Sequence, residues 1–568
     1  MNKKRKKVFT GVGSVTILLL INLLASNFNQ RFDLTEEKRY SLSAPTKNLL
    51  RSLDSTVTID VFLTGEELPA VVRMYRNKLS DFLSENKEYS RNNLQINFID
   101  PYDGRDTATV RQLEDSLAFY YGLKPVVINA PDEVGDELRI KKLIHGAVVI
   151  KGERRLGVDL LQGVRSYGTE PEQLATLYND VEASMEYKFA SAIQKVSTTQ
   201  RPLIGYALGH GEGWGYNVDD AVRTLLSEYN FDTINVRQVR YIPSQVDALV
   251  VLKPTQAFNN DDKLKIDQYV MNGGKVFWMI DNMYAEFDSL YKSNGFIAFD
   301  RALNLEDLLF NYGVRINQTL LQDMQCDKLG QVSSDGQQQR LVDWPFFPVL
   351  NGTDHPVSKN LDGVRSMFPT SMDTVESPGV RKTILLQTSN NTRWLSAPAK
   401  IDFEFLQIAP DEKLFHQKPT SVAILLEGTF RSLYTGRVAK AVADSLKVQN
   451  RPFTSISQPG KMIIVSDGDI AMNQYSQFDG PLPMGYNLYI RQTFANKNFF
   501  VNSLEYLVNP TDILQTRSKE YSLRLLDPKQ VNENKNKWQL INIALPIALI
   551  ILFGLIYQQL RKRKYAPD

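Results

Sequence analysis

The chain has 568 residues, and at roughly 100–200 residues per domain this length predicts three or four globular domains. Its composition, 43% hydrophobic and 23% charged, excludes long disorder, collagen-like repeats and a polytopic membrane protein. Its 66 Lys and Arg residues nearly balance 64 Asp and Glu residues, so the net charge of +2 provides no field that attracts a nucleic acid. The single cysteine, Cys326, excludes internal disulfides and Cys-based metal sites, and the four histidines lie too far apart for a His-rich metal site.

The two ends of the chain predict membrane helices. Residues 8–30 and 538–560 are each 23 residues without a charge. A helix that rises about 1.5 Å per residue crosses a hydrocarbon core of roughly 30 Å in that length. Basic residues 3–7 precede the first segment and basic residues 561–564 follow the second, so the positive-inside rule puts both termini in the cytoplasm and residues 31–537 outside. The alternatives are a cleaved signal peptide for the first segment and a buried core helix for the second.

The first external unit, residues 56–200, has a β-α-β-α-β-β-α order that resembles the thioredoxin-like fold. Pro125 precedes the third expected strand, where that fold carries a cis-proline, so we expect a cis Lys124–Pro125 bond. The redox CxxC is absent: the first strand is followed by Thr64-Gly65-Glu66-Glu67. The expected elements of this unit are Thr56–Leu63, Leu68–Lys87, Leu94–Ile99, Ala108–Tyr121, Val126–Ile128, Ala147–Lys151, Leu156–Leu160 and Pro171–Val196.

A second unit begins at Arg201, where apolar strands alternate with helices in the pattern of a parallel sheet covered on both faces. We predict an open, flavodoxin-like α/β domain interrupted by a β-rich insertion. Its expected strands are Pro202–Leu208, Thr233–Val236, Ala248–Leu252, Lys275–Ile280 and Lys461–Ser466, and its expected helices are Asp219–Tyr229, Asp261–Met271 and Asn498–Val508. The predicted divisions of the chain are 1–30 (basic tip and first membrane helix), 31–55 (linker), 56–200 (thioredoxin-like), 201–313 (α/β, first part), 314–460 (β-rich insertion), 461–510 (α/β, closing part), 511–537 (linker), 538–560 (second membrane helix) and 561–568 (basic tail).

Polar residues follow several of the predicted parallel strands at the point where each strand ends. Ligands of open α/β sheets bind outside the carboxyl ends of the strands, so we expect these residues to share one acidic rim, a candidate ligand pocket. The residues expected at this rim are Gly209, His210, Gly211, Glu212, Asp281, Asp467 and Asp469. Two alternatives stay open: the carboxylates cap helix N-termini or loop N–H groups, or His210 and Glu212 act as an acid–base pair.

The same loops lack the signatures of several catalytic and cofactor sites. A GxGxxG fingerprint would need a glycine at Trp214, and no GK[ST] sequence follows, so nucleotide binding is not expected. Ser466 lacks a GxSxG elbow, and Cys326 has no histidine nearby in the sequence. We therefore expect no catalytic residue, no cofactor and no metal.

Several short motifs follow one another in an order that resembles a known family. They are Arg31-Phe32-Asp33-Leu34-Thr35, Tyr40-Ser41-Leu42-Ser43, Gly209-His210-Gly211-Glu212 and Val465-Ser466-Asp467-Gly468-Asp469. With its terminal spans, the chain resembles the auxiliary component of ABC-2-type transport systems, specifically the gliding-motility-associated ABC transporter protein of Bacteroidota usually labelled a substrate-binding protein. The middle domain in that family is compared with the GIFT domain, a relative of glutamine-amidotransferase-like folds, but this chain lacks their Cys nucleophile elbow.

The resemblance implies a non-enzymatic subunit of an ABC transporter complex, anchored in the inner membrane with its large domain in the periplasm, that supports gliding motility and the secretion linked to it. The implied partners are an ABC-2-type permease, a cytoplasmic ATPase reached through the permease, membrane lipid and a second copy of the chain. Because the chain has no Walker motif, it cannot drive transport alone. A structural adaptor without transport, or a hydrolase or sugar-modifying enzyme that uses the acidic rim, are the alternatives.

Overall fold

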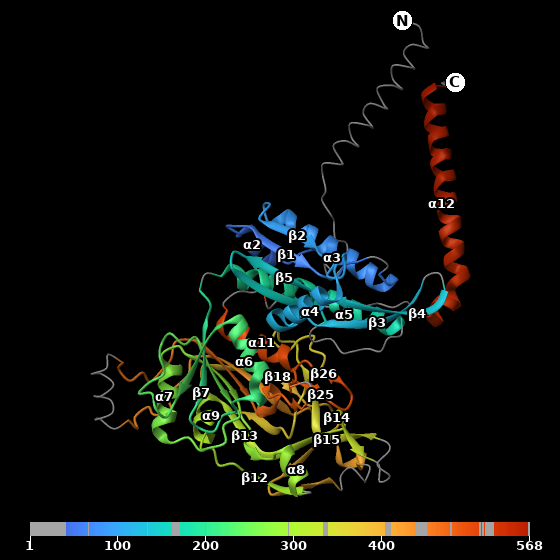
Figure 1. The fold of residues 1–568 in the computed structure, drawn as a ribbon. Helices are drawn as coiled ribbons and strands as arrows, with labels where there is room; N and C mark the ends of the chain where they lie inside the picture. Colours follow the sequence, from blue (N-terminus) through green and yellow to red (C-terminus); the bar gives the residue numbers. More distant parts are fainter. Residues whose placement is uncertain are drawn as a thin grey trace. The chain divides into compact units, whose positions relative to one another are not determined.

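The computed structural model describes most of the chain between Ser41 and Tyr565 (Figure 1). The described residues are 41–65, 68–132, 135–161, 171–198, 200–293, 295–332, 339–403, 410–438, 451–477, 480–509, 513, 516 and 528–565. The chain divides into two compact units, Met1–Lys519 and Glu520–Asp568. The first expected membrane segment, residues 8–30, lies outside the described residues.

The N-terminal part of the larger unit is a four-stranded sheet in the order β2-β1-β5-β6, in which β1 and β2 are parallel and the other neighbours antiparallel. Val57, Ile59 and Val61 of β1 are buried at alternate positions, because successive side chains of a strand point to opposite faces. They share a core with helices α2, α3 and α5, whereas Leu117 of α4 packs in a second core with Val148 of β5. The bounds are α2 Ala44–Arg51, β1 Val57–Val61, α3 Ala70–Tyr89, β2 Leu94–Phe98, α4 Thr107–Tyr121, β3 Pro125–Asp132, β4 Gly135–Ile144, β5 Gly146–Lys151, β6 Arg154–Asp159 and α5 Pro171–Ser197.

One expectation for this part is confirmed and one is wrong. The expected strand Val126–Ile128 lies within β3, which begins at Pro125 and pairs with β4 in a two-stranded hairpin of its own. The first two residues of that segment are exposed, which fits a hairpin outside the core. Among the described residues the cis peptide bond is Ala397–Pro398, and Lys124–Pro125 is not cis. The thioredoxin-like assignment stays a prediction.

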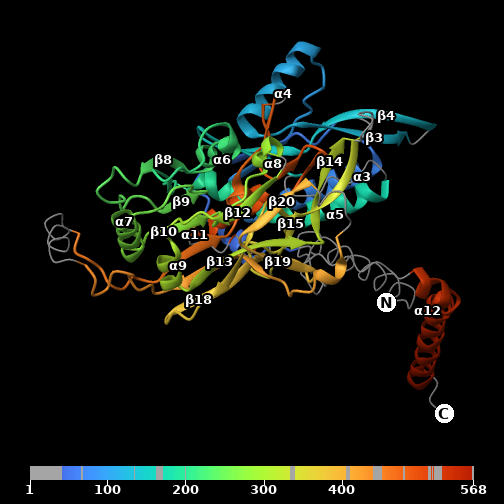
Figure 2. The ribbon, with the colours of Figure 1, turned by 90° about the horizontal axis from the view of Figure 1, so that it is seen from below.

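The rest of the larger unit is built on a thirteen-stranded sheet, which Figure 2 shows from another side. Its neighbours β22-β10-β9-β7-β8 are parallel, and β9 is buried along its whole length. One core joins alternate residues of β9 with α6 and α11, and another joins the intervening residues with α7 and α9, so helices cover both faces. The α/β class is confirmed, and β22 joins β10 from far along the sequence, as expected. The bounds are β7 Leu203–Leu208, α6 Asp219–Glu228, β8 Asn230–Asn235, β9 Ala248–Leu252, α7 Asn260–Met271, β10 Lys275–Met279, α9 Glu306–Tyr312, β22 Gly460–Val465 and α11 Asn496–Val508.

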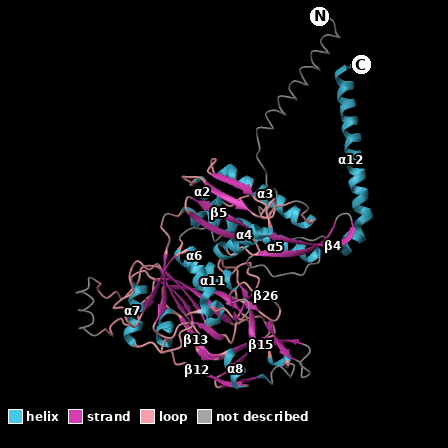
Figure 3. Cartoon of the chain, viewed as in Figure 1, coloured by secondary structure: helices cyan, strands magenta, loops and turns pink. Residues whose placement is uncertain are grey.

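The region expected as a β-rich insertion is rich in strands, and these continue the same sheet (Figure 3). β21 pairs antiparallel with β22 on one side and β18 on the other, and β18 leads on to β15 and β14. Trp344, Phe346, Phe347 and Phe368 form a further core, which includes residues of the small sheet β11-β12-β20. The bounds are β11 Met283–Tyr284, α8 Phe287–Ser293, β12 Gly295–Asp300, β13 Val314–Asp323, β14 Cys326–Val332, β15 Gln339–Gly352, β16 Val364–Arg365, β17 Thr370–Thr374, β18 Val380–Gln387, β19 Thr392–Ser396, β20 Ala399–Asp402, β21 Ser421–Gly428, β23 Tyr475–Ser476, β24 Gly480–Pro481, β25 Tyr486–Asn487 and β26 Gln492–Thr493.

The smaller unit contains the helix α12, Pro528–Tyr565. Within it, Lys537–Arg563 has a mean hydropathy of 2.5 over its most apolar window, and none of that window is buried. Its 27 residues reach about 40 Å, more than a bilayer core of roughly 30 Å. Among the described residues this is the one helix long and apolar enough to cross a membrane, and it contains the second expected span. The two-span arrangement stays a prediction.

Candidate functional site

The expected rim residues lie at one edge of the parallel part of the sheet. His210 follows β7, Asp281 follows β10, and Asp467 follows β22. Lys253, directly after β9, stands between them in the strand order β22-β10-β9-β7. Because parallel neighbours end at the same edge, all four loops meet there. The residues form two groups, one acidic around Lys253 and one around His210.

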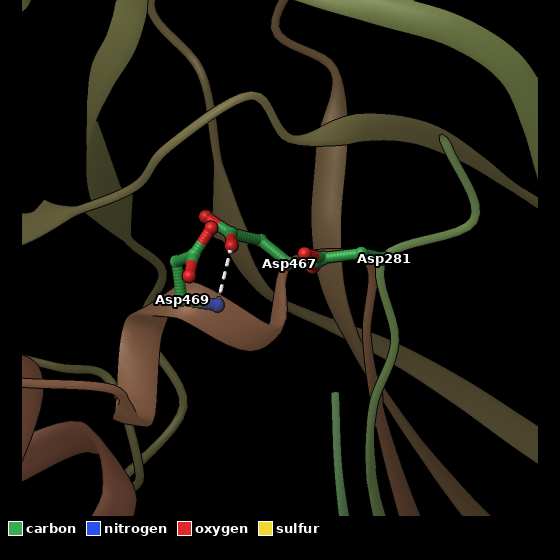
Figure 4. A group of neighbouring side chains, drawn as sticks. All are labelled: Asp281, Asp467 and Asp469. Carbon is green, nitrogen blue, oxygen red and sulfur yellow. Dashed lines mark hydrogen bonds between the residues drawn. The ribbon is translucent and has the colours of Figure 1, made fainter. Parts of the chain in front are cut away.

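The acidic group consists of Asp281, Asp467 and Asp469, whose carboxylate oxygens lie within 4.8 Å of one another (Figure 4). That spacing would suit a metal ion, but an ammonium group already bonds two of the three carboxylates. Lys253 Nζ lies 3.0 Å from Asp281 Oδ2 and 2.5 Å from Asp469 Oδ1. It also lies 3.2 Å from Glu286 Oε2. The side chain of Lys253 is only 8% exposed, so the protein supplies the counter-charge of this group from its own buried lysine.

Asp467 is fully buried and accepts hydrogen bonds through both carboxylate oxygens. The Ser366 hydroxyl donates to it at 2.5 Å, the Met367 N–H at 2.8 Å and the Asp469 N–H at 2.8 Å. Asp281 accepts a further bond, at 2.5 Å, from the N–H of Gly468. Asp467 thereby caps a short 3₁₀ helix, Gly468–Ala471, and ties it to the chain at Ser366. These contacts agree with the capping alternative for the rim carboxylates.

Burial dominates the protonation of this group. It raises the pKa of Asp467 well above its usual range, and the neighbouring Asp469 and Asp281 charges add to the shift. Burial also raises the pKa of Asp469, to about 7, against the lowering effect of Lys253. Burial alone would lower the pKa of the Lys253 ammonium, but Asp281, Asp469 and Glu286 outweigh it and raise that pKa well above its ordinary value. The lysine therefore stays charged, and Asp467 and Asp469 retain a proton more readily than free carboxyls do.

The second group is centred on His210, which is fully buried and stacks on Phe258 with ring centroids 3.7 Å apart. Its Nε2 lies 3.1 Å from Asp262 Oδ2, and its backbone N–H donates to Glu212 Oε2 at 2.7 Å. Its Nδ1 lies 3.6 Å from Glu212 Oε1, too far for a hydrogen bond. Asp262 is bonded in turn by Lys265 Nζ at 2.9 Å. His210 and Glu212 are thus neighbours, but both lie inside the protein.

The glycines on either side of His210 let two loops approach closely. Gly209 and Gly211 have φ of +119° and +75°, a region that other residues rarely adopt. A Cβ on Gly211 would lie 2.1 Å from Thr255 Oγ1, so the loop after β7 packs directly on the loop after β9. There, the His210 carbonyl accepts the N–H groups of Thr255 and Gln256, both at 2.8 Å. The glycine-rich segment therefore connects the two loops through its backbone.

Two cavities of the described region lie elsewhere. A cavity of about 1,940 Å³ is lined by α4, β6 and α6, and one of about 700 Å³ lies beside α7. None of the seven expected rim residues lines either cavity. The sequence therefore predicted the shared edge of the sheet, but not that the rim groups would be buried against one another.

The sequence segment that contains this site matches a known protein family. Residues 201–503, more than half of the chain, match the family described as ABC-type uncharacterized transport system. The chain belongs to this ABC-type transport system family. All seven rim residues lie inside the matched range, and residues 36–150 match a domain of unknown function. The expected ABC transporter auxiliary family is therefore confirmed at this level.

Two further matches are more distant. An uncharacterized protein of Borreliella burgdorferi (strain ATCC 35210 / DSM 4680 / CIP 102532 / B31) is 19% identical over 577 residues, which cover 99% of this chain and 100% of that protein. The solved mmIFT52 N-terminal domain is 11% identical with a TM-score of 0.30, and the match covers 54% of this chain and 97% of that domain.

Three residues of this site were not among the expected rim residues. Lys253, Asp262 and Glu286 each pair with an expected rim residue or with its partner. Lys253 carried a signal, because it directly follows an apolar strand that was predicted to lie next to the others. Asp262 and Glu286 carried none, because their pairing depends on how α7 and the loop after β11 pack.

Proposed function

We propose that this chain is a non-enzymatic, membrane-anchored subunit of an ABC transporter complex whose permease and ATPase are separate chains. Its large domain stands outside the cytoplasmic membrane, in the periplasm, and both termini lie in the cytoplasm. The match of residues 201–503 supports a component of an ABC-type transport system. The resemblance of its short motifs to gliding-motility-associated proteins supports a role in gliding and the secretion linked to it.

The observation that carries the non-enzymatic part of the proposal is the position of Lys253. A catalytic carboxylate needs access to a substrate and freedom to exchange a proton with it. Asp281 and Asp469 are instead bonded to a buried lysine, and Asp467 is bonded to Ser366 and the backbone. The strand-end groups that hold ligands in other open α/β proteins are used here to hold four loops together.

The anchoring part of the proposal rests on α12. A helix whose most apolar window has a mean hydropathy of 2.5, none of it buried, is costly in water, and the basic residues Arg561–Lys564 lie at the C-terminal end of the helix. A membrane span of this kind can contact a permease directly within the bilayer, which a chain without a Walker motif needs in order to take part in transport. Two finer fold assignments belong to the same proposal: a thioredoxin-like N-terminal part without CxxC, supported by its β2-β1-β5-β6 order, and a GIFT-like α/β part, supported by its parallel sheet.

Purification of the tagged full chain from native membranes in mild detergent tests the proposal. We expect it to bring down, in comparable amounts, one polytopic ABC permease and one ATPase with a Walker motif. The control is a chain ended before Pro528, which lacks α12 and should lose the permease. Recovery of envelope proteins without either ABC component would support the adaptor function instead. Recovery of the chain alone would contradict the proposal.

A further inference from the structure

The cavity of about 700 Å³ beside α7 has an unusual charge. It lies between α7 and the segment 237–246 that follows β8, with Arg451 at its rim. Five cationic side chains and two carboxylates line it, an excess of three positive charges in one cavity of a chain whose total net charge is +2. They are Arg237, Arg240, Lys265, Lys275, Arg451, Asp247 and Asp261.

Both carboxylates of this cavity are already engaged. Asp261 lies 2.9 Å from Lys265 Nζ, and Asp247 accepts the Leu203 N–H at 2.8 Å. Lys265 is held as well by Asp262 and by the Val236 carbonyl. This lysine is therefore part of the cavity wall, and its charge is balanced inside the protein.

Within the described part of the chain, no carboxylate pairs with any of the other four cations, three of which are Arg237, Arg240 and Lys275. Arg451 is bonded only to neutral groups, the Ile242 carbonyl at 3.3 Å and the Ser244 hydroxyl at 3.4 Å. Its guanidinium lies 3.9 Å from the centre of the Tyr241 ring, a cation–π contact that orients the guanidinium but leaves its charge in place.

Cations that line one cavity repel one another unless an anion lies between them. Arginine offers its N–H groups in a planar fork that matches the two oxygens of a phosphate or carboxylate, and lysine adds a point charge. A cavity of about 700 Å³ falls in the range of small-molecule sites and exceeds what a single inorganic phosphate fills. The donor geometry, the cavity volume and the excess positive charge all fit a small compound with more than one phosphate or carboxylate group.

We propose that this cavity binds a small ligand with two or more oxyanion groups, held by Arg237, Arg240, Lys275 and Arg451. The shared chemistry is a phosphate ester or phosphoanhydride, which reaches the site either as a soluble oligophosphate or as an anionic lipid headgroup. The site is separate from the strand-end cluster around Lys253, and the proposal does not depend on the transporter assignment.

The experiment is a calorimetric titration of the detergent-purified full chain with inorganic pyrophosphate. A triple variant, Arg237→Ala with Arg240→Ala and Lys275→Ala, removes three of the four unpaired cations. A control variant, Arg393→Ala with Lys413→Ala and Lys418→Ala, removes the same charge from the β-rich part of the chain, away from the cavity. Equal far-ultraviolet circular dichroism and melting temperature of the two variants confirm that both are folded.

We expect the triple variant to bind pyrophosphate at least about tenfold more weakly than the wild type, because even one hydrogen bond to a charged group is worth that factor. The control should stay within about twofold, and binding should weaken as salt is raised. A parallel titration compares a short-chain cardiolipin, a lipid with two phosphate groups, with dihexanoyl phosphatidylcholine. Binding of the cardiolipin alone assigns the site to a lipid headgroup, and binding of pyrophosphate without it assigns a soluble ligand. The proposal is overturned if neither phosphate probe binds the wild type, or if the triple variant binds as tightly as the wild type does.

Discussion

Lys253 is the residue on which the strand-end cluster depends. It adopts φ of +47°, a conformation that costs a non-glycine residue roughly 1 kcal/mol or more, and its buried ammonium is bonded to Asp281, Asp469 and Glu286. The conformation and the burial are tolerated together because they bring the ammonium to the carboxylates. The sequence placed this lysine at a strand end, but the burial of its charge follows only from the packing of four loops.

The first prediction is that Lys253→Met strongly destabilises the folded chain. Methionine fills a similar volume but leaves two buried carboxylates without their counter-charge, a loss of about 3–5 kcal/mol in comparable cases. Lys328→Met is the matched control, since Lys328 and Asp343 form an exposed ion pair worth about 0–1 kcal/mol. Urea unfolding followed by Trp fluorescence measures both. Equal losses in the two variants would mean that the cluster does not hold the loops.

The second prediction concerns pH. Burial raises the pKa of Asp467, and that of Asp469 to about 7, so the folded chain binds a proton that the unfolded chain, at about 4, has released. This contribution to stability is complete below pH about 4 and is lost as the pH rises through about 7. Asp467→Asn removes one of the two carboxyls whose pKa burial raises. The free energy of unfolding of this variant should therefore fall less steeply with pH than that of the wild type, and the two slopes should differ by up to about 1.4 kcal/mol per pH unit. Urea titrations at several pH values between these limits test it, and parallel profiles would refute the assignment.

At the scale of elements, α5 joins the N-terminal sheet to the α/β part. Lys195 on α5 lies 2.6 Å from Glu228 at the end of α6 and 3.4 Å from Glu505 on α11. Glu505 also accepts from the Tyr229 hydroxyl at 3.2 Å, and Tyr187 of α5 donates to Asn502 of α11 at 3.1 Å. One helix thus contributes to the cores on both sides and carries a buried charge between them.

The third prediction is that Lys195→Met weakens the contact of α5 with α6 and α11. The lysine side chain is 12% exposed and balances two glutamates, so its loss should cost about 3 kcal/mol and increase amide exchange in α6 and α11. Lys78→Met serves as the control, because Lys78 pairs with Glu182 of the same α5 but is 37% exposed. Hydrogen exchange read by mass spectrometry resolves the helices separately. Unchanged exchange in α6 and α11 would show that apolar packing alone holds them.

The elements that the sequence predicted best are those with a strong periodic signal. The buried strands β7, β9, β10 and β22 are near-continuous apolar runs, and their alternation with helices indicated a parallel sheet. The strand that starts at Pro125 was predicted but its pairing with β4 was not, because a short apolar segment does not show which strand it pairs with. The continuity of the antiparallel strands with the parallel sheet was also missed, because the apolar pattern of β21 does not show that it pairs antiparallel with β22. Local patterns specify strands, whereas pairing depends on the whole chain.

The fourth prediction is made for the whole molecule. A periplasm-active reporter fused near residue 250 should be active, and one fused after Asp568 should be inactive, because basic residues 561–564 keep the C-terminus in the cytoplasm. Phosphatase and fluorescent-protein fusions at the same positions give opposite signals in each compartment. The reverse pattern would contradict the periplasmic placement of the large domain.

The central claim is that the chain works as a membrane-bound partner of a permease, and replacement of one helix tests it most directly. Residues 538–560 are exchanged for leucines with Arg561–Lys564 kept, so the chain stays anchored but loses the small and polar surface of α12. Specific helix contacts in membranes are worth about 1–2 kcal/mol, so the permease recovered with the tagged variant should fall on the order of tenfold relative to the wild type. Recovery of the same amount of permease with both chains would contradict the claim that α12 binds it.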